Sequence, residues 1–253
     1  ISALSYGNRV IGFVTAVFVI SVTTAAFPQM SRLSAMKNTR KLKATFARSV
    51  GLMSLMVLPI SAGVILFAPQ IVALLFERGA FTAYDTQRTA EVVQYYALGL
   101  IFFSIKEVVL NMFYAIEDTI TPTINSILAI FINIGLNLLL IKSMAHKGLA
   151  LATTISGGVT LLLLLVVLRK RIGRLGLGRI FASLVKMGVS TAGMCLVAAP
   201  LYDLLYGQLE SILPSFLLAA LAGALVYGLL NILLRTKEMG ALVIGLLERL
   251  MPS

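Results

Sequence analysis

Residues 119–168, TITPTINSILAIFINIGLNLLLIKSMAHKGLALATTISGGVTLLLLLVVL, contain the pattern from which the fold class can be inferred. Two runs without Asp, Glu, Lys or Arg, 119–141 and 148–168, flank a short basic connection. A helix needs about 20 apolar residues to cross a bilayer core about 30 Å thick. Both runs meet this length, and the short connection makes them antiparallel neighbours. The stretch therefore predicts a transmembrane helical hairpin.

Further apolar stretches of similar length lie on either side of this hairpin. They cover residues 11–31, 49–76, 92–116, 180–202 and 211–234. The stretch 92–116 is long enough to cross a membrane only if Lys106 and Glu107 lie within the span. The chain is 59% hydrophobic and 12% charged, whereas soluble domains are about 45–50% apolar and about 25% charged. We therefore expect an all-α, polytopic helical membrane protein with seven transmembrane helices.

The positively charged residues gather in alternate gaps between these stretches. Fifteen Lys and Arg residues fall in the gaps 32–48 and 169–186 and in the tail after 234, whereas the opposite loops hold only Arg78, Arg88, Lys142 and Lys147. Cytoplasmic loops carry an excess of Lys and Arg. The basic gaps and the C-terminus are therefore predicted to face the cytoplasm. The net charge of +11 arises from basic residues that flank the spans. We therefore expect membrane lipids as partners and no nucleic acid.

Four local features add detail to this topology. Seven spans with a cytoplasmic C-terminus place residue 1 outside, and the chain begins with Ile1 rather than Met, so we expect it to be the C-terminal part of a longer protein. Residues 39–48 resemble a basic helix that lies on the cytoplasmic surface, and Pro59 is expected to bend the second span. The short apolar stretch 239–247 suggests an interfacial helix at the C-terminus.

Ionisable side chains inside spans are costly, so they mark a cavity, a pathway or a pair. Arg9 stands one turn before the first uncharged run. One interpretation is an interfacial Arg whose side chain reaches the lipid headgroups. The other is a cation that binds an anion in a water-filled cavity, where a guanidinium group can contact phosphate through two hydrogen bonds.

The third span contains two adjacent charges, Lys106 and Glu107, and Asn111 follows one turn beyond Glu107. Adjacent residues point in different directions on a helix, so Lys106 and Glu107 cannot pair well with each other. Each therefore needs a partner on another helix, or water. Structural ion pairing and the lining of a substrate path both remain open for these residues.

A polar patch is predicted inside the hairpin. Asn133 and Asn137 are four residues apart and share one helix face, and Thr153 and Thr154 follow the tight connection. The two patches can meet within the membrane. Hydrogen bonding between the helices and a weak cation or water site are the alternatives. We favour the former, because two amides and a hydroxyl carry no charge to hold a cation.

Sequence motifs for catalysis are absent. The chain has no phosphate-binding glycine loop, no dinucleotide-binding glycine pattern and no metal-ligand spacing of His, Cys or carboxylates. Cys195 and His146 each occur alone. We therefore expect no enzyme activity, no catalytic residues, no metal and no cofactor.

An ordered series of motifs resembles the MurJ/MviN family of lipid II flippases. It comprises LFERGAF (75–81), YYALGL (95–100), Lys106 and FYAIEDTITP (113–122). SYGNR (5–9) and FPQMSRLSA (27–35) resemble the first span of that family's second lobe and its exit into the cytoplasm. The family is part of the multidrug/oligosaccharidyl-lipid/polysaccharide exporter superfamily, whose members have two six-helix lobes around a central cavity.

The resemblance implies a division of the chain into three parts. Residues 1–175 would form the second transporter lobe without its first helix, and the missing N-terminal lobe would be its partner. Residues 176–235 would form two additional transmembrane helices of a lipid-tail groove, and 236–253 an interfacial tail.

The resemblance also implies a function. The chain would belong to a bacterial inner-membrane flippase that moves the undecaprenyl-pyrophosphate-linked peptidoglycan precursor, lipid II, to the outer leaflet by alternating access. Arg9 matches the cavity arginine of the family, and Asn8, Lys106, Glu107 and Asn111 would line the same cavity. The chain departs from the family at Asn8 and Gly12, where acidic residues often occur, so the charge partner of Arg9 is in doubt. Without an ATP site, transport would be coupled to an ion gradient or the membrane potential.

Three rival functions can be stated. A related exporter of another polyprenyl-linked glycan or of a drug would share the fold and the charge pattern, but not the series from LFERGAF to FYAIEDTITP. A membrane-embedded enzyme would need acidic or His motifs at the interface, and the sequence lacks them. A non-transporting scaffold would use the basic cytoplasmic surface to recruit partners.

Overall fold

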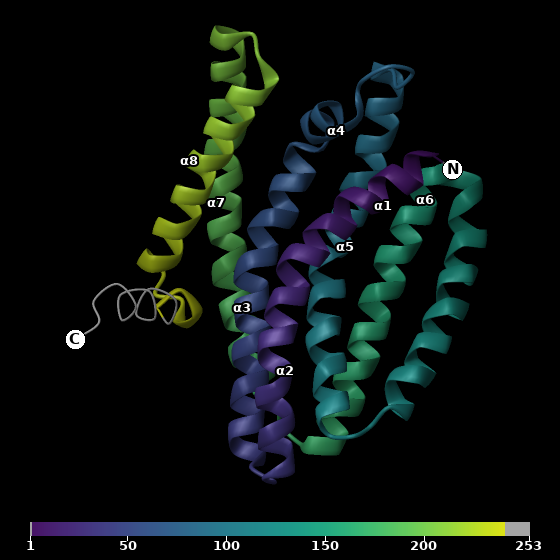
Figure 1. Ribbon diagram of the computed structural model, residues 1–253, viewed down its shortest axis with the longest axis vertical. Helices are drawn as coiled ribbons and strands as arrows, with labels where there is room; N and C mark the ends of the chain where they lie inside the picture. Colours follow the sequence, from purple (N-terminus) through teal and green to yellow (C-terminus); the bar gives the residue numbers. More distant parts are fainter. Residues whose placement is uncertain (1, 241–253) are drawn as a thin grey trace.

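The computed structural model describes residues 2–240, apart from the side chains of Ser2, Ala145, Leu177 and Arg179. Over this range the chain is built from helices (Figure 1). They are α1 Ser2–Val14, the π-helical turn η1 Thr15–Val19, α2 Ile20–Ala35, α3 Thr39–Leu66, α4 Ala68–Phe76, α5 Ala83–Ala115, α6 Ile120–Ile172, α7 Leu177–Leu209 and α8 Ile212–Leu233. Seven segments of the described range are long and apolar enough to cross a membrane. The predicted all-α polytopic fold is confirmed.

The first span is one helical segment, Ala3–Ala35, that changes direction along its length. Its two α-helical parts, α1 and α2, are separated by η1, and Figure 1 shows that α1 is inclined relative to α2. A π-helical turn inserts an extra residue into a helical turn and is one cause of helix bending. The bend lays α1 across α5 near the end of the molecule that carries α4.

The predicted boundaries of the second span, 49–76, were wrong. The Oδ1 atom of Asn38 accepts a hydrogen bond from the backbone N–H of Lys41 at 3.1 Å and so caps the start of α3. From there α3 continues to Leu66 with Pro59 inside it. The basic residues 39–48 are therefore the first turns of the spanning helix and do not form a separate surface helix. The helix ends before Phe67, and Pro69 lies in the first turn of α4.

The other spans agree with the prediction more closely. Helix α5 contains both Lys106 and Glu107, as the length of the third span required. Helix α6 contains two spans, Ile120–Met144 and His146–Ile172, which lie antiparallel as predicted (Figure 1). The predicted interfacial helix 239–247 lies for the most part outside the described residues.

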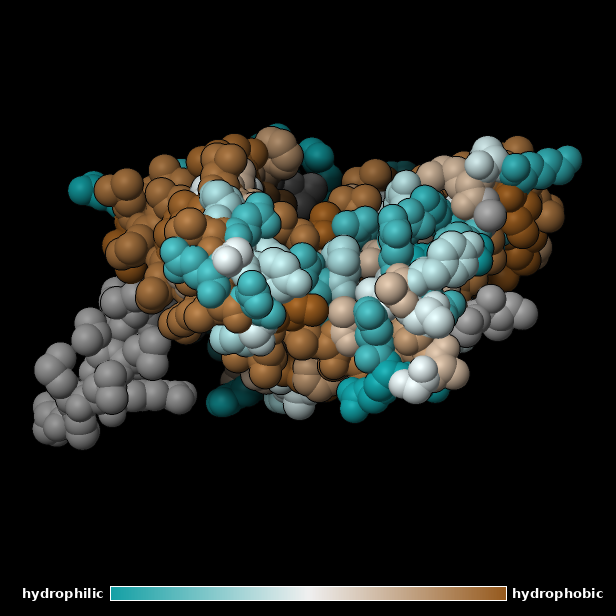
Figure 2. Space-filling view, turned by 90° about the horizontal axis from the view of Figure 1, so that it is seen from above, coloured by the Kyte–Doolittle hydropathy of each residue, from teal (hydrophilic) through white to brown (hydrophobic). Residues whose placement is uncertain are grey.

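The two ends of the helical bundle differ in charge. We call them the α4 end, which also carries the α7–α8 turn, and the basic end, where the turns α2–α3, α5–α6 and α6–α7 lie (Figure 1). The gaps 32–48 and 169–174, with their cluster of Lys and Arg, are at the basic end. Figure 2 shows the α4 end, where hydrophilic residues gather towards the middle and hydrophobic surface flanks them. This distribution suits a protein surrounded by lipid.

Helices α7 and α8 pack against each other and stand beside the rest of the bundle (Figure 1). They contact the rest mainly through α3. The hydroxyl group of Tyr227 donates to the backbone oxygen of Leu55 at 2.8 Å. At the α4 end, the ring of Phe67 forms edge contacts with those of Tyr202 and Phe216.

The FYAIEDTITP motif forms the turn between α5 and α6. Asp118 accepts hydrogen bonds from the backbone N–H of Thr121 at 3.0 Å and from its hydroxyl at 2.8 Å. It also pairs with Arg171, at the far end of α6, at 3.2 Å. The Thr121 backbone donor, aided by Arg171, holds the pKa of Asp118 below its usual range. Asp118 thus joins both ends of the hairpin.

Candidate functional site

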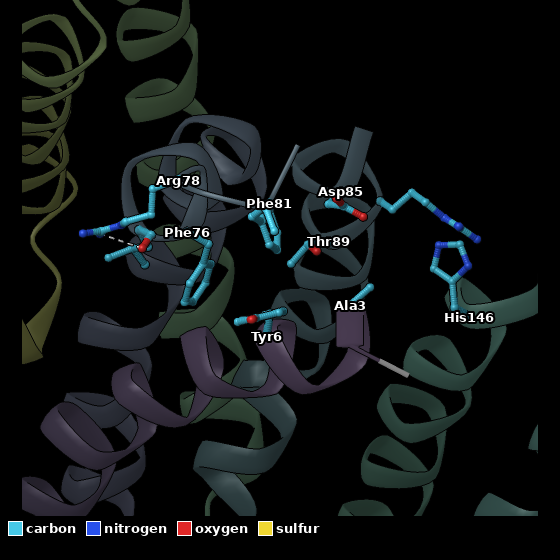
Figure 3. Close-up of a pocket in the computed structure, with 11 residues that line it drawn as sticks. Ala3, Tyr6, Phe76, Arg78, Phe81, Asp85, Thr89 and His146 are labelled. Atoms are coloured by element: carbon cyan, nitrogen blue, oxygen red, sulfur yellow. Dashed lines mark hydrogen bonds between the residues drawn. The ribbon is translucent and has the colours of Figure 1, made fainter. Parts of the chain in front are cut away.

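The LFERGAF motif packs against the first span at the α4 end. The ring of Tyr6 lies 4.8 Å from that of Phe76 and 5.2 Å from that of Phe81, and Figure 3 shows the three side chains turned towards one another. Gly79 has a φ of +64°, in the region that favours glycine. The hydroxyl group of Thr86 donates to Glu77 at 2.7 Å, which ties the loop to α5. These contacts fix the position of α1.

A cavity of about 570 Å³ lies beside this aromatic cluster. Its lining includes Tyr6, Phe81, Asp85 and His146 (Figure 3). It also includes Ala3, at the start of the described chain. The cavity therefore lies at the start of the described chain, and we assign it no ligand.

Arg9 is exposed and lies one turn along α1 from Tyr6. Its guanidinium carbon is 5.6 Å from the centre of the Tyr6 ring, within the range of a cation–π contact. Within residues 2–240, Arg9 makes no ion pair with a carboxylate. Asn8 is exposed beside it. The guanidinium group is thus oriented by an aromatic ring, and its charge is left uncompensated.

The exposed face of the first span continues from Arg9 towards the basic end. Phe13 is 71% exposed, and a Cβ atom added at Gly12 would meet nothing within 4 Å. The other exposed residues on this part of the span recur at helical spacing: Ala16, Val17, Ile20, Ser21, Thr24 and Ala25. One long face of the first span therefore has no partner helix within the described chain.

The structure brings Lys106 together with the hairpin polar patch. The Nζ atom of Lys106 is 3.4 Å from the hydroxyl of Thr160, on the second half of α6. Both residues line a cavity of about 310 Å³ together with Asn133, Thr153 and Ser156. Two groups of candidate residues that lie far apart in the sequence thus share one polar pocket between α5 and α6.

Within this pocket the expected contact between the two halves of α6 is present. The amide of Asn133 donates to the hydroxyl of Thr153 at 3.3 Å, and the amide of Asn137 donates to the Oδ1 atom of Asn133 at 2.9 Å. Thr154 points elsewhere and donates to the backbone oxygen of Tyr95 on α5. The buried Oδ1 atom of Asn137 has no hydrogen-bond partner within the described chain.

Glu107 and Asn111 lie apart from this pocket. The amide of Asn111 approaches the backbone oxygen of Thr23 on α2 at 3.5 Å, at the limit of a hydrogen bond. Glu107 is exposed and forms no hydrogen bond or ion pair with another described residue. The predicted group of cavity residues is therefore divided, because Lys106 contacts α6 whereas Asn111 contacts the first span.

Three contributing residues were missed in the sequence. Thr160 and Ser156 belong to a stripe with Thr153, at spacings of three and four residues, that was visible within an otherwise apolar run. Tyr6 carries no comparable signal, because its role depends on a loop about 70 residues away. Among residues 2–240, no group of three or more His, Cys, Asp or Glu side chains is placed to hold a metal ion.

Comparison with solved structures identifies a similar fold. A structure described as "Lipid II flippase MurJ, inward closed conformation" superimposes with a TM-score of 0.76 at 26% sequence identity. The match covers 93% of this chain and 47% of that chain.

Curated relatives with the description "Probable lipid II flippase MurJ" also match. The protein from Rickettsia prowazekii is 34% identical over 164 residues, which cover 65% of this chain and 32% of the relative. The protein from Borreliella burgdorferi is 30% identical over 155 residues, covering 61% and 31%. The chain thus spans about a third of the length of these relatives.

A family profile matches most of the chain as well. The profile described as "MurJ: Lipid II flippase MurJ" matches residues 1–223. This range includes the first span with Arg9, the LFERGAF loop, the α6 hairpin and α7. The chain therefore belongs to the lipid II flippase MurJ family.

Proposed function

We propose that this chain forms the C-terminal part of a bacterial flippase that carries lipid II from the inner to the outer leaflet of the inner membrane. The observation that carries the proposal is the unpartnered face of the first span, with an uncompensated guanidinium group at Arg9. Family membership over residues 1–223 supports it. The chain covers 32% of the Rickettsia prowazekii relative and 47% of the similar solved structure, which is consistent with one lobe of a two-lobed transporter.

The chemistry of the substrate fits this face. A pyrophosphate group that enters a cavity of low dielectric constant needs charged donors, and Arg presents several N–H groups in a planar fork. The contact with the Tyr6 ring would limit the conformations of the Arg9 side chain before the anion arrives, which would reduce the conformational entropy lost on binding. The apolar remainder of the face would lie beside the first part of the polyprenyl chain.

Alternating access requires each lobe to move as a unit. Helix α5 contacts the first span, α3, α4 and α6, so it holds the described lobe together. The two lobes would rock about the cavity between them, as in other transporters built from repeats. We propose that Asn8, Glu107 and Asn111 contribute to the side of the lobe that meets the cavity, whereas Lys106 stabilises the α5–α6 contact.

We further propose that the basic end faces the cytoplasm. Lys and Arg residues are strongly concentrated at this end, and such an excess marks cytoplasmic loops. Cysteines introduced at Lys41 and Arg174 should react with an impermeant reagent only from the cytoplasmic side, and cysteines at Asp85 and Gln208 only from outside. Reaction of the cysteines at 41 and 85 from the same side would refute this orientation.

Substitution of Arg9 tests the transport proposal. Arg9→Ala in the full-length protein should reduce lipid II translocation to background, because hydrogen bonds to charged groups contribute about 1.5–3 kcal/mol each. Arg9→Lys keeps the charge without the planar fork and should retain partial activity. Headgroup translocation in proteoliposomes measures both.

Arg88→Ala is the matched control, because Arg88 also lies over a tyrosine ring, that of Tyr84, at 5.3 Å. It should leave translocation near normal, and all variants should insert at normal abundance. Unchanged translocation in Arg9→Ala would contradict the proposal and indicate that Arg9 only contacts lipid headgroups at the membrane interface.

The pocket between α5 and α6 is proposed to bond helices rather than bind a cation tightly. Its described oxygen ligands are amides, hydroxyls and carbonyls, and Lys106 already places a positive charge there. The thermal unfolding temperature of the purified protein should therefore be the same in sodium as in potassium. A sodium-specific stabilisation that disappears in Asn137→Ala, but persists in Ser143→Ala outside the pocket, would overturn this expectation.

A further inference from the structure

A second charged cavity, of about 600 Å³, lies at the basic end between α3, the start of α7 and the residues after α8. Four exposed cations line it: Arg48, Lys186, Arg235 and Lys237. Glu238 supplies the one carboxylate of the described lining. Within residues 2–240 none of the four cations forms an ion pair. The cavity therefore carries an excess of positive charge that no described side chain neutralises.

This cavity is held by specific contacts between its three walls. The Nζ atom of Lys186 on α7 donates to the backbone oxygen of Leu234, at the end of α8, at 3.0 Å. The hydroxyl of Ser183 donates to Glu238 at 3.2 Å. Glu238 also lies against α3 at Gly51, where an added Cβ atom would be only 2.6 Å from its Oε1 atom. Glu238 therefore accepts a structural hydrogen bond, and Lys186 already donates one of its three N–H groups to Leu234. Among the described residues, Arg48, Arg235 and Lys237 keep their side-chain donors for a ligand.

The charged cavity adjoins an apolar groove. Arg48 and Leu52 line both this cavity and a second hollow of about 640 Å³ between the first span and α3. The walls of the second hollow are mostly apolar, with Val17, Phe18, Val22, Ala25, Ala26 and Met56 among them. A ligand with an anionic head and a long hydrocarbon chain could occupy both.

We propose that this cavity binds the headgroup of an anionic glycerophospholipid, with one acyl chain between the first span and α3. A free phosphate ion would leave the apolar groove unused. Glycerophospholipids form the bulk of the leaflet in which the cavity lies, and anionic headgroups attract clustered Lys and Arg. The lipid would join α3 to the α7–α8 pair. The headgroup cavity lies at the opposite end from Arg9, whereas Val17, Ser21 and Ala25 of the apolar groove belong to the exposed face of the first span.

A fluorescence experiment tests this site directly. The sequence contains no Trp, so Leu52→Trp places a single reporter where the cavity and the groove meet. In vesicles, phosphatidylglycerol with brominated acyl chains should quench this Trp more strongly than brominated phosphatidylcholine at equal mole fraction. We expect a preference of about tenfold, the effect of one or two cations near an anionic lipid. If Leu52→Trp does not fold, Ala47→Trp reports from the same cavity.

Two quadruple variants separate this site from general surface charge. The combined changes Arg48→Gln, Lys186→Gln, Arg235→Gln and Lys237→Gln should abolish the preference. The matched changes Arg40→Gln, Arg174→Gln, Lys37→Gln and Lys41→Gln remove the same charge from the same end, outside the cavity, and should preserve it. Circular dichroism checks that both variants fold.

Four results would overturn the proposal. Equal quenching by the two lipids, or an equal loss of preference in both quadruple variants, would mean that no specific site exists. Recovery of fluorescence on addition of inorganic phosphate would make the cavity a site for free anions. Displacement of phosphatidylglycerol by a smaller mole fraction of undecaprenyl diphosphate would make it a site for the polyprenyl carrier.

Discussion

Hydrogen bonds from side-chain hydroxyls to the backbone of a neighbouring helix hold this protein together. In a membrane, lipid gives apolar helices no hydrophobic reason to associate, so close packing and polar contacts must do so. Such bonds join α3 to α5, α5 to α6, the two halves of α6, and α8 to α3; their donors are Ser61, Thr154, Ser156 and Tyr227. The exposed face of the first span is one of the regions that this network leaves open, and the first half of α6 is another.

Much of the fold could be predicted from the sequence because the bilayer imposes it. The thickness of the hydrocarbon core sets the length of the spans and of the uncharged runs in the sequence. The short connection within α6 requires its two halves to lie antiparallel. The contact of Asn133 with Thr153 followed from the same constraint. The start of the second span was mispredicted because a helix may extend into water beyond the bilayer, and hydropathy does not detect where Asn38 caps it.

The site was harder to predict than the spans. The partner of Lys106 on α6 depends on how two helices rotate about their axes, which a single sequence does not specify. The contact of Tyr6 with the LFERGAF loop depends on the bend at η1, and the sequence of that turn does not indicate a bend. Sequence patterns therefore located polar residues within spans, whereas only the structure showed which of them meet.

We propose that the open face of the first span lines a water-filled cavity. It can be tested by replacing Cys195 with Ser, introducing single cysteines at Gly12 and Ala16, and measuring their rates of reaction with a water-soluble maleimide in native membranes. Leu138, 67% exposed on α6, is the control for a lipid-facing position. We expect the cysteines at both first-span positions to react and the control cysteine not to react. If both first-span cysteines are as unreactive as the control, this face does not line a water-filled cavity.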